Sequence, residues 1–188
     1  MTFSNVGRLD ADADAQDVSL AMDEDAFRLF YDRTASPLLS YLCRMTGSRQ
    51  VADDLLQESY YRLLRATQRF DDDGHRKNYL FRIATNLVYD WRRTAAARPL
   101  DGAAPITDGN AGAQPPHAEQ RVEVRSAMHL LKPRDRALLW LAYAEGSSHG
   151  EIADVLGVRR ESIKVLLFRA KARLAGLLRG SSSGGRRS

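Results

Sequence analysis

The sequence predicts an all-α protein made of two small helical domains joined by a flexible linker. Apolar residues recur at helical spacing over residues 26–94 and again over residues 121–179, and no segment shows the alternation typical of a strand. Residues 95–120 are rich in Ala, Gly and Pro and have no periodic apolar face, so we expect them to form the linker. Residues 1–25 and 180–188 also lack such a face, and we expect a disordered acidic arm and a disordered tail.

Two helices open the first domain. One begins near Ala26, and the Ser36-Pro37 pair can restart it, because serine caps a helix and proline fits its first position. Gly47 ends this helix, and Ser48 then caps a long one that we expect to run to about Arg69. Each helix has one apolar face: Phe27, Phe30, Tyr31, Leu38, Leu39 and Leu42 in the first, and Val51, Leu55, Leu56, Tyr60, Leu63 and Leu64 in the second.

A loop at residues 71–74 precedes a third helix, which we expect from about Asn78 to Thr94. One face of it is apolar and is expected to point inward, and the other is polar and basic. The inward residues are Leu80, Ile83, Ala84, Leu87, Val88 and Trp91, and the outward ones are Arg82, Asn86, Asp90, Arg92 and Arg93.

The second domain is expected to begin with a helix from Ala118 to Leu131, followed by one that Pro133 starts. Ser148 and Glu151 then have the S-x-x-E spacing of a capping box. The pattern that follows, up to Leu174, is that of a helix-turn-helix. Ile152, Ala153 and Leu156 face inward on its first helix, Gly157 makes the turn, Val158 anchors the corner, and Ile163, Leu167 and Ala170 line the second helix.

Basic charge lies in two blocks, which is typical of a protein that binds a polyanion. Residues 26–94 hold twelve basic and eight acidic residues, and residues 121–188 hold fourteen basic and six acidic residues. Residues 1–25 hold seven acidic residues and one base. The basic second helix of the helix-turn-helix could reach base edges and phosphates in a major groove, whereas a solvated basic hairpin is the alternative.

Other features favour a cytoplasmic protein without membrane insertion. Cys43 has no second cysteine with which to form a disulfide or a metal pair, which fits a reducing compartment. The longest apolar run, Ala137–Ala144, is far shorter than a membrane span. The acidic start of the chain lacks the pattern of a secretory signal.

Motifs in both halves resemble those of one family. In the first half they are residues 26–33 (AFRLFYDR), 52–58 (ADDLLQE) and 80–87 (LFRIATNL). In the second they are residues 131–136 (LKPRDR), 144–158 (AEGSSHGEIADVLGV) and 169–174 (RAKARL). Over residues 26–94 and 121–178 the chain resembles a bacterial RNA polymerase sigma factor of the sigma-70 family, in the extracytoplasmic-function (ECF) subfamily. This small type retains only the second and fourth conserved regions.

The resemblance implies a non-enzymatic transcription initiation factor that needs no cofactor and no metal. It implies that Asp54, Gln57 and Glu58 lie on the surface that binds core RNA polymerase. This surface would dock on the clamp helices of the largest polymerase subunit. Melted minus-10 DNA would contact Arg76, Lys77, Tyr79, Arg82, Asn86, Arg92 and Arg93, with a flipped base received near Asn86. Duplex minus-35 DNA would contact Arg159, Arg160, Ser162, Lys164, Val165, Arg169 and Lys171. An anti-sigma factor would hold the protein inactive, and the acidic arm folding back on the second domain is an internal alternative.

The chain departs from the family pattern in two places. Tyr79 stands where the family usually has a tryptophan, so its contacts with minus-10 DNA need not be those of other members. Val165 and Leu166 stand where the family is commonly polar or basic. Either a slight rotation of the helix buries Leu166, or apolar contact with thymine methyl groups replaces a phosphate contact.

Three other functions fit the sequence less well. A helix-turn-helix repressor or activator explains residues 121–178 but leaves the first domain unexplained. An enzyme lacks support because the four histidines, His75, His117, His129 and His149, are scattered and no nucleophile or phosphate-loop motif is present. A protein-protein adaptor with incidental basic charge would show no salt-dependent DNA binding.

Overall fold

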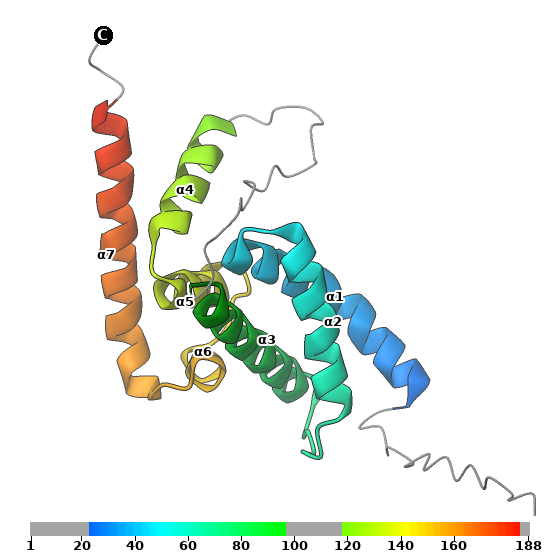
Figure 1. Ribbon diagram of the computed structural model, residues 1–188. Helices are drawn as coiled ribbons and strands as arrows, with labels where there is room; N and C mark the ends of the chain where they lie inside the picture. The colour runs from blue at the N-terminus through cyan, green and yellow to red at the C-terminus, as the bar shows by residue number, and fades with distance from the viewer. Residues whose placement is uncertain (1–22, 97–117, 185–188) are drawn as a thin grey trace, which may run out of the picture.

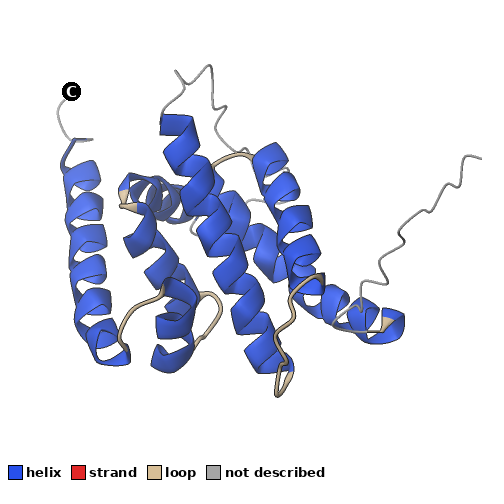
Figure 2. Cartoon of the chain, turned by 60° about the horizontal axis from the view of Figure 1, so that its bottom comes forward, coloured by secondary structure: helices blue, strands red, loops and turns tan. Residues whose placement is uncertain are grey.

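The computed structural model describes residues 23–96 and 118–184, and within these ranges the chain forms seven α-helices and no strand (Figures 1 and 2). The first half consists of α1 (Glu24–Thr46), α2 (Arg49–Leu64) and α3 (Asp73–Ala96). The second half consists of α4 (Ala118–Leu130), α5 (Pro133–Tyr143), α6 (His149–Leu156) and α7 (Arg160–Gly184). The predicted all-α fold is confirmed. Most of the expected arm, linker and tail lies outside the described residues.

Helix α1 runs without a break through Pro37, so the predicted restart at Ser36-Pro37 is wrong. Proline removes one hydrogen bond from the helix ladder. Its neighbours Leu38, Tyr41 and Leu42 are fully buried, and their packing keeps both sides of the proline on one axis. The helix ends as predicted at Gly47, whose φ of 77° is readily adopted by a residue without a side chain.

The boundary between α2 and α3 also differs from the prediction. Helix α2 is capped by Ser48 as expected but ends at Leu64 rather than near Arg69, and α3 begins at Asp73 rather than near Asn78. The carboxylate of Asp72 accepts a hydrogen bond from the His75 backbone N–H at 2.7 Å, which caps the early start of α3. The ring of Phe70 packs on Tyr79 at 5.2 Å and holds the connection against α3.

Two buried hydroxyl pairs join the helices of the first half. The Thr34 hydroxyl donates to the Phe30 carbonyl at 2.6 Å and lies 2.7 Å from the Tyr60 hydroxyl, which joins α1 to α2. The Tyr41 hydroxyl lies 2.8 Å from that of Thr85 and joins α1 to α3. Burial raises the pKa of Tyr60 to about 12, so this hydroxyl keeps its proton at neutral pH.

The second half confirms the predicted helix-turn-helix. Ser148 caps α6, and the reciprocal bond from the Ser148 N–H to the Glu151 carboxylate completes the capping box at 2.7 Å. Gly157 closes α6 with a φ of 62°. An ion pair of 2.7 Å between Arg173 and Asp135 ties α7 to α5, and α7 extends to Gly184, beyond the predicted end of the domain at residue 179.

The two halves pack against each other. Helix α3 lies beside α6, and the C-terminal end of α1 meets α5 (Figures 1 and 2). A single set of buried apolar residues runs through both halves, from Phe30 in α1 to Ala170 in α7. The functional surfaces are therefore arranged around one packed body.

Candidate nucleic-acid interface

One side of α3 presents four of the residues that sequence analysis assigned to minus-10 DNA. Tyr79, Arg82, Asn86 and Arg93 follow one another at spacings of three, four and seven residues, so they lie along one side of the helix. Arg82, Asn86 and Arg93 are exposed, and Tyr79 is half-buried. The guanidinium of Arg82 lies 4.8 Å from the centroid of the Tyr79 ring. A stacked aromatic and guanidinium beside a free amide can hold an unpaired base.

The other three assigned residues of α3 do not join this row. Arg76 lies between the rings of Phe30 and Phe70 and pairs with Asp73 at 2.6 Å, so its contacts hold the first half together. Arg92 was expected to point outward, but it is half-buried and donates to the Met45 carbonyl. Burial of the Arg92 guanidinium lowers its pKa, because the charged form loses contact with water. Lys77 faces the second half of the chain.

Helix α7 carries an exposed surface of mixed basic and apolar character. Of the residues assigned to minus-35 DNA, Arg159, Arg160, Lys164, Val165, Arg169 and Lys171 are exposed and Ser162 is half-buried. The side chain of Val165 is 49% exposed. Phe168, one turn further along, is 73% exposed, and sequence analysis missed it. Phe168 follows Lys164 by four residues, so helical spacing alone would have placed it on the same exposed side of the helix.

The structure answers part of the question raised by Val165 and Leu166. Leu166 is half-buried and packs against the core of the second half, whereas Val165 is exposed to solvent. The apolar run is therefore divided between the core and the outer surface. An exposed valine on a helix that also exposes Lys164 and Arg169 suits a ligand that has both phosphates and apolar groups.

The residues assigned to polymerase docking share one side of α2. Asp54 and Gln57 are exposed, and the Glu58 carboxylate pairs with Arg62 at 2.6 Å. Tyr61, four residues after Gln57, is 53% exposed and adds an aromatic ring to the same side. Tyr61 was not among the residues expected from the sequence to bind polymerase. The exposed ring is of a kind enriched at protein–protein interfaces, and the acidic groups suit a partner of opposite charge.

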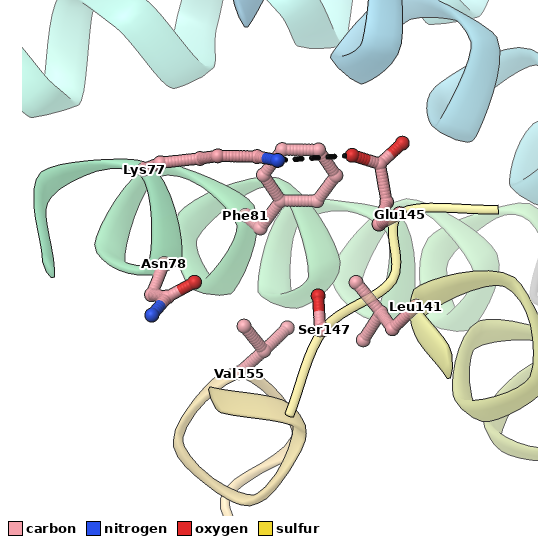
Figure 3. A pocket seen from close by; sticks show the side chains of 7 residues that line it. All are labelled: Lys77, Asn78, Phe81, Leu141, Glu145, Ser147 and Val155. Atoms are coloured by element: carbon pink, nitrogen blue, oxygen red, sulfur yellow. Dashed lines mark ion pairs between the residues drawn. The ribbon is translucent and has the colours of Figure 1, made fainter. Parts of the chain in front are cut away.

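A seam of polar contacts joins α3 to the second half (Figure 3). The Nζ of Lys77 lies 3.2 Å from the carboxylate of Glu145, whose side chain is only 8% exposed. The amide of Asn78 donates to the Glu151 carboxylate at 3.3 Å. The Phe81 ring lies beneath the Lys77 side chain, with 5.5 Å from Nζ to the ring centroid.

The second tie between the halves is a buried arginine. Arg136, in α5, is only 3% exposed, and its guanidinium donates to main-chain carbonyls alone. The acceptors are Arg44 and Met45 at the end of α1, Met128 and His129 at the end of α4, and Leu131. Burial, with a smaller effect of the Arg92 charge, lowers the pKa of Arg136 to about 10, so it stays protonated at neutral pH.

Two further kinds of site are absent from the described residues. It contains no group of three or more His, Cys, Asp or Glu side chains that could hold a metal ion. No helix within residues 23–96 and 118–184 combines the length and the apolar character needed to cross a bilayer.

Two family models match the chain, one in each half. The model of Sigma-70 region 2 matches residues 30–98, and that of Sigma-70, region 4 matches residues 121–174. The first match spans α1 to α3, and the second begins in α4 and ends in α7. Both predicted surfaces therefore fall within matched segments.

Several curated proteins are similar over most of the chain. ECF RNA polymerase sigma factor SigM of Mycobacterium tuberculosis is 31% identical over 172 residues, which cover 89% of this chain and 85% of that protein. SigL of the same species is 30% identical over 80% of this chain and 87% of its own length. BldN of Streptomyces coelicolor is 29% identical over 84% of this chain, which spans 62% of that longer protein.

Solved structures share the fold. The sigma factor RpoE in complex with the anti-sigma factor NepR, from Bartonella quintana, aligns with a TM-score of 0.62 at 19% identity, covering 81% of this chain and 96% of that one. CnrH in complex with the cytosolic domain of CnrY aligns with a TM-score of 0.63 at 24% identity, covering 84% and 90%.

Proposed function

The chain belongs to the ECF sigma factors of the sigma-70 family, and from this premise we propose that it binds core RNA polymerase and directs initiation at specific promoters. One observation carries the proposal beyond family membership. The described residues form two exposed surfaces of different character, one with a stacked aromatic on α3 and one with exposed cations on α7. A factor that reads both melted and duplex DNA needs these two kinds of surface.

Helix α7 is the proposed reader of the minus-35 duplex. Its cations can neutralise phosphates, and an arginine such as Arg160 can donate two hydrogen bonds to a guanine edge. The capping box of Ser148 and Glu151 and the turn at Gly157 fix α6 relative to α7. Rigid support of this kind is what a recognition helix needs in order to keep its register on the base pairs.

The outer row of α3 is the proposed site for the melted minus-10 element. An unpaired base exposes its whole face and its Watson–Crick edge, so it can stack on a ring and bond to an amide. Tyr79 with Arg82 supplies the stacking platform, and Asn86 supplies a donor and an acceptor one turn away. Arg93 would lie near the backbone phosphates.

Polymerase docking is assigned to the α2 side that contains Asp54, Gln57 and Glu58. Such docking would place the protein in the cytoplasm, where RNA polymerase acts. We further propose that an anti-sigma factor restrains the protein by covering this same side. The two half-chains are proposed to work as separable domains, with a linker that would have a root-mean-square span of about 25–30 Å if flexible.

Two alanine variants test the division of labour. Asn86→Ala should impair promoter opening by purified core polymerase and leave binding of the minus-35 duplex nearly unchanged. Arg160→Ala should weaken the closed complex by about 1–3 kcal/mol if it makes a bidentate base contact. Gel-shift titration measures the closed complex, and permanganate reactivity of unpaired thymines measures opening.

The controls use exposed residues outside both surfaces. Arg49→Ala and Arg28→Ala remove surface arginines from α2 and α1 and should leave both steps unchanged. Equal defects of Asn86→Ala and Arg160→Ala at both steps would contradict the division. Absence of promoter-dependent transcription with core polymerase would contradict the proposed function itself.

A further inference from the structure

We propose that residues 18–22, directly before α1, pack against an aromatic cluster at the start of that helix, and that the acidic stretch at residues 10–17 lies along the basic residues that follow α2. The aromatic cluster consists of Phe27 and Tyr31 in α1 and Tyr60 in α2. The proposal assigns an occupant to an exposed surface of the first half. It does not depend on DNA binding, and only its consequence for polymerase rests on the proposed function.

The aromatic cluster leaves an apolar surface open to water. The ring centroids of Tyr31 and Tyr60 lie 4.8 Å apart, and that of Phe27 lies 5.9 Å from Tyr60 and 6.0 Å from Tyr31. Tyr60 is 4% exposed and its hydroxyl contacts that of Thr34, but Tyr31 is 40% exposed and Phe27 is half-buried. An apolar side chain placed over the two α1 rings would be removed from water, which is favourable.

The residues just before α1 have the pattern that such a surface requires. Val18, Leu20 and Met22 alternate with smaller residues, and alternating side chains of an extended chain share one face. An extended chain from Asp23 back to Leu20 spans about 10 Å, and Tyr31 lies about 12 Å along the helix from Asp23. Residues 18–22 can therefore cover the aromatic cluster if the chain turns back at the start of α1.

The cap of α1 favours such a turn. The Asp23 carboxylate accepts the Ala26 N–H at 2.8 Å, so Met22 directly precedes the cap and Phe27 is the fourth residue of the helix. Apolar residues at these two positions pack together in the hydrophobic staple, which fixes the angle at which the chain enters a helix. The first apolar contact of the proposed packing is thus a local one.

Charge favours a place for the acidic stretch beside α2. Residues 10–17 hold four acids and no base. The N-terminal end of α1 lies beside the C-terminal end of α2, where Arg65 and Arg69 follow the helix and are exposed (Figure 1). Arg65 bonds to the Tyr61 hydroxyl rather than to a carboxylate. The acidic stretch would be repelled by the two acids in the first turn of α1 and attracted to these two arginines.

Packing of this kind affects polymerase binding. Gln57, on the proposed docking side of α2, lies one turn before Tyr60 and Tyr61. A segment on the aromatic cluster therefore borders the docking side, so the segment and polymerase compete for the same edge. This consequence rests on the proposed function. It differs from the alternative in which the acidic arm folds back on the second half.

Chymotrypsin digestion of the full-length chain tests the packing. Cleavage after Leu20 requires the segment to leave the surface, so its rate follows the unpacked fraction, whereas Phe3 lies outside the segment and serves as an internal control. Tyr31→Ser should raise the rate after Leu20 about three- to tenfold, because it removes much of the ring surface, and leave the rate after Phe3 unchanged. Tyr143→Ser replaces another exposed tyrosine and should change neither rate. Equal rates for the two variants would overturn the packing.

A second pair of variants leaves α1 intact. Arg65→Ser with Arg69→Ser should raise cleavage after Leu20 about twofold, a difference that disappears at about 1 M NaCl because surface charges are then screened. Lys164→Ser with Arg169→Ser, at exposed positions of α7, is the matched control and should have no effect. No effect of either pair would overturn the contact of the acidic stretch, and an effect of the α7 pair alone would place the acidic arm on the second half instead. Protection that rises with protein concentration would mean that a second copy covers the cluster, which would also overturn the proposal.

Titration onto immobilised core polymerase tests the consequence. Leu20→Asp removes the central apolar group of the segment and should bind polymerase about threefold more tightly than Asn5→Asp, which adds the same charge outside it. Equal affinities would overturn competition while the packing stands on the digestion. Absence of binding by every variant would instead contradict the proposed function and leave the packing untouched.

Discussion

Replacement of Arg136 by methionine should destabilise the protein more than replacement of any exposed arginine. The guanidinium is 3% exposed and reaches carbonyl oxygens at the ends of two helices, α1 and α4. Methionine fills a similar volume but donates no hydrogen bond. The last carbonyls of a helix have no partner within it, so the variant leaves several of them buried and unsatisfied.

The magnitude follows from these contacts. Hydrogen bonds to a charged donor contribute about 1.5–3 kcal/mol each, and the clearest of those made by Arg136 are to Met128 at 2.8 Å, Arg44 at 3.1 Å and Leu131 at 3.2 Å. Burial of the cation costs several kcal/mol and offsets much of that sum. Each carbonyl left buried without a donor costs about 1–3 kcal/mol, so we expect a net loss of about 3–5 kcal/mol. With a urea m-value of about 2 kcal/mol/M, the midpoint should fall by about 2 M.

Urea titration of the full-length chain, followed by circular dichroism, measures this loss. Arg134→Met on the same helix is the matched control, because Arg134 is exposed and its replacement should change stability by less than about 0.5 kcal/mol. Arg136→Lys keeps the charge but lacks the planar fork, so its midpoint should lie between the two. Coincident transitions for Arg136→Met and Arg134→Met would refute the reasoning.

Three further outcomes are expected. Glu151→Gln keeps an acceptor for the Ser148 N–H but removes the carboxylate charge, so it should cost up to about 1 kcal/mol at pH 7. Since the pKa of Glu151 is lowered from 4.5 in the folded state, the wild-type advantage is present above pH 4.5 and lost as the pH falls through the lowered value, so denaturation midpoints that stay apart in acid would contradict it. Val165→Ser should abolish about a fourfold preference for thymine over deoxyuridine in the minus-35 duplex, measured by gel shift, because one buried methyl group is worth about 0.8 kcal/mol; a preference that persists would rule out this contact. Gly157→Ala should lower stability by about 1–2 kcal/mol because its φ is 62°, whereas Gly176→Ala inside α7 should raise it by up to about 1 kcal/mol, and thermal melts that move in the same direction would contradict the conformational argument.

Local signals in the sequence predicted much of the fold. The caps at Ser48 and Ser148 and the ends at Gly47 and Gly157 depend on groups within four residues of one another, so their patterns are readable from the chain. Pro37 misled the prediction because its local effect is outweighed by core packing around α1. The connection after α2 is held against α3 by the ring contact of Phe70 with Tyr79, which no helical periodicity encodes.

The candidate surfaces were predicted best where they lie on one helix. The exposed row of α7 follows from helical spacing around its buried Ile163 and Leu167. By contrast, the inward turn of Arg92 and the contact of Arg136 with the end of α1 join residues that are 47 and 92 positions apart. Spacing along the chain holds no information about such pairs, since they depend on how the helices pack.

The carbonyl contacts of Arg136 also bear on how this architecture can vary between relatives. On the α1 side the acceptors are backbone oxygens of Arg44 and Met45, which any residue at those positions would still present. Between these two partners, only the arginine of the second half has to be a particular residue type. The Arg136 contact itself therefore places no demand on those two side chains, although Met45 is buried in the core and Arg44 lies over the ring of Trp140. A chimera that joins this second half to the first half of a relative should retain the contact if its α1 has the same length.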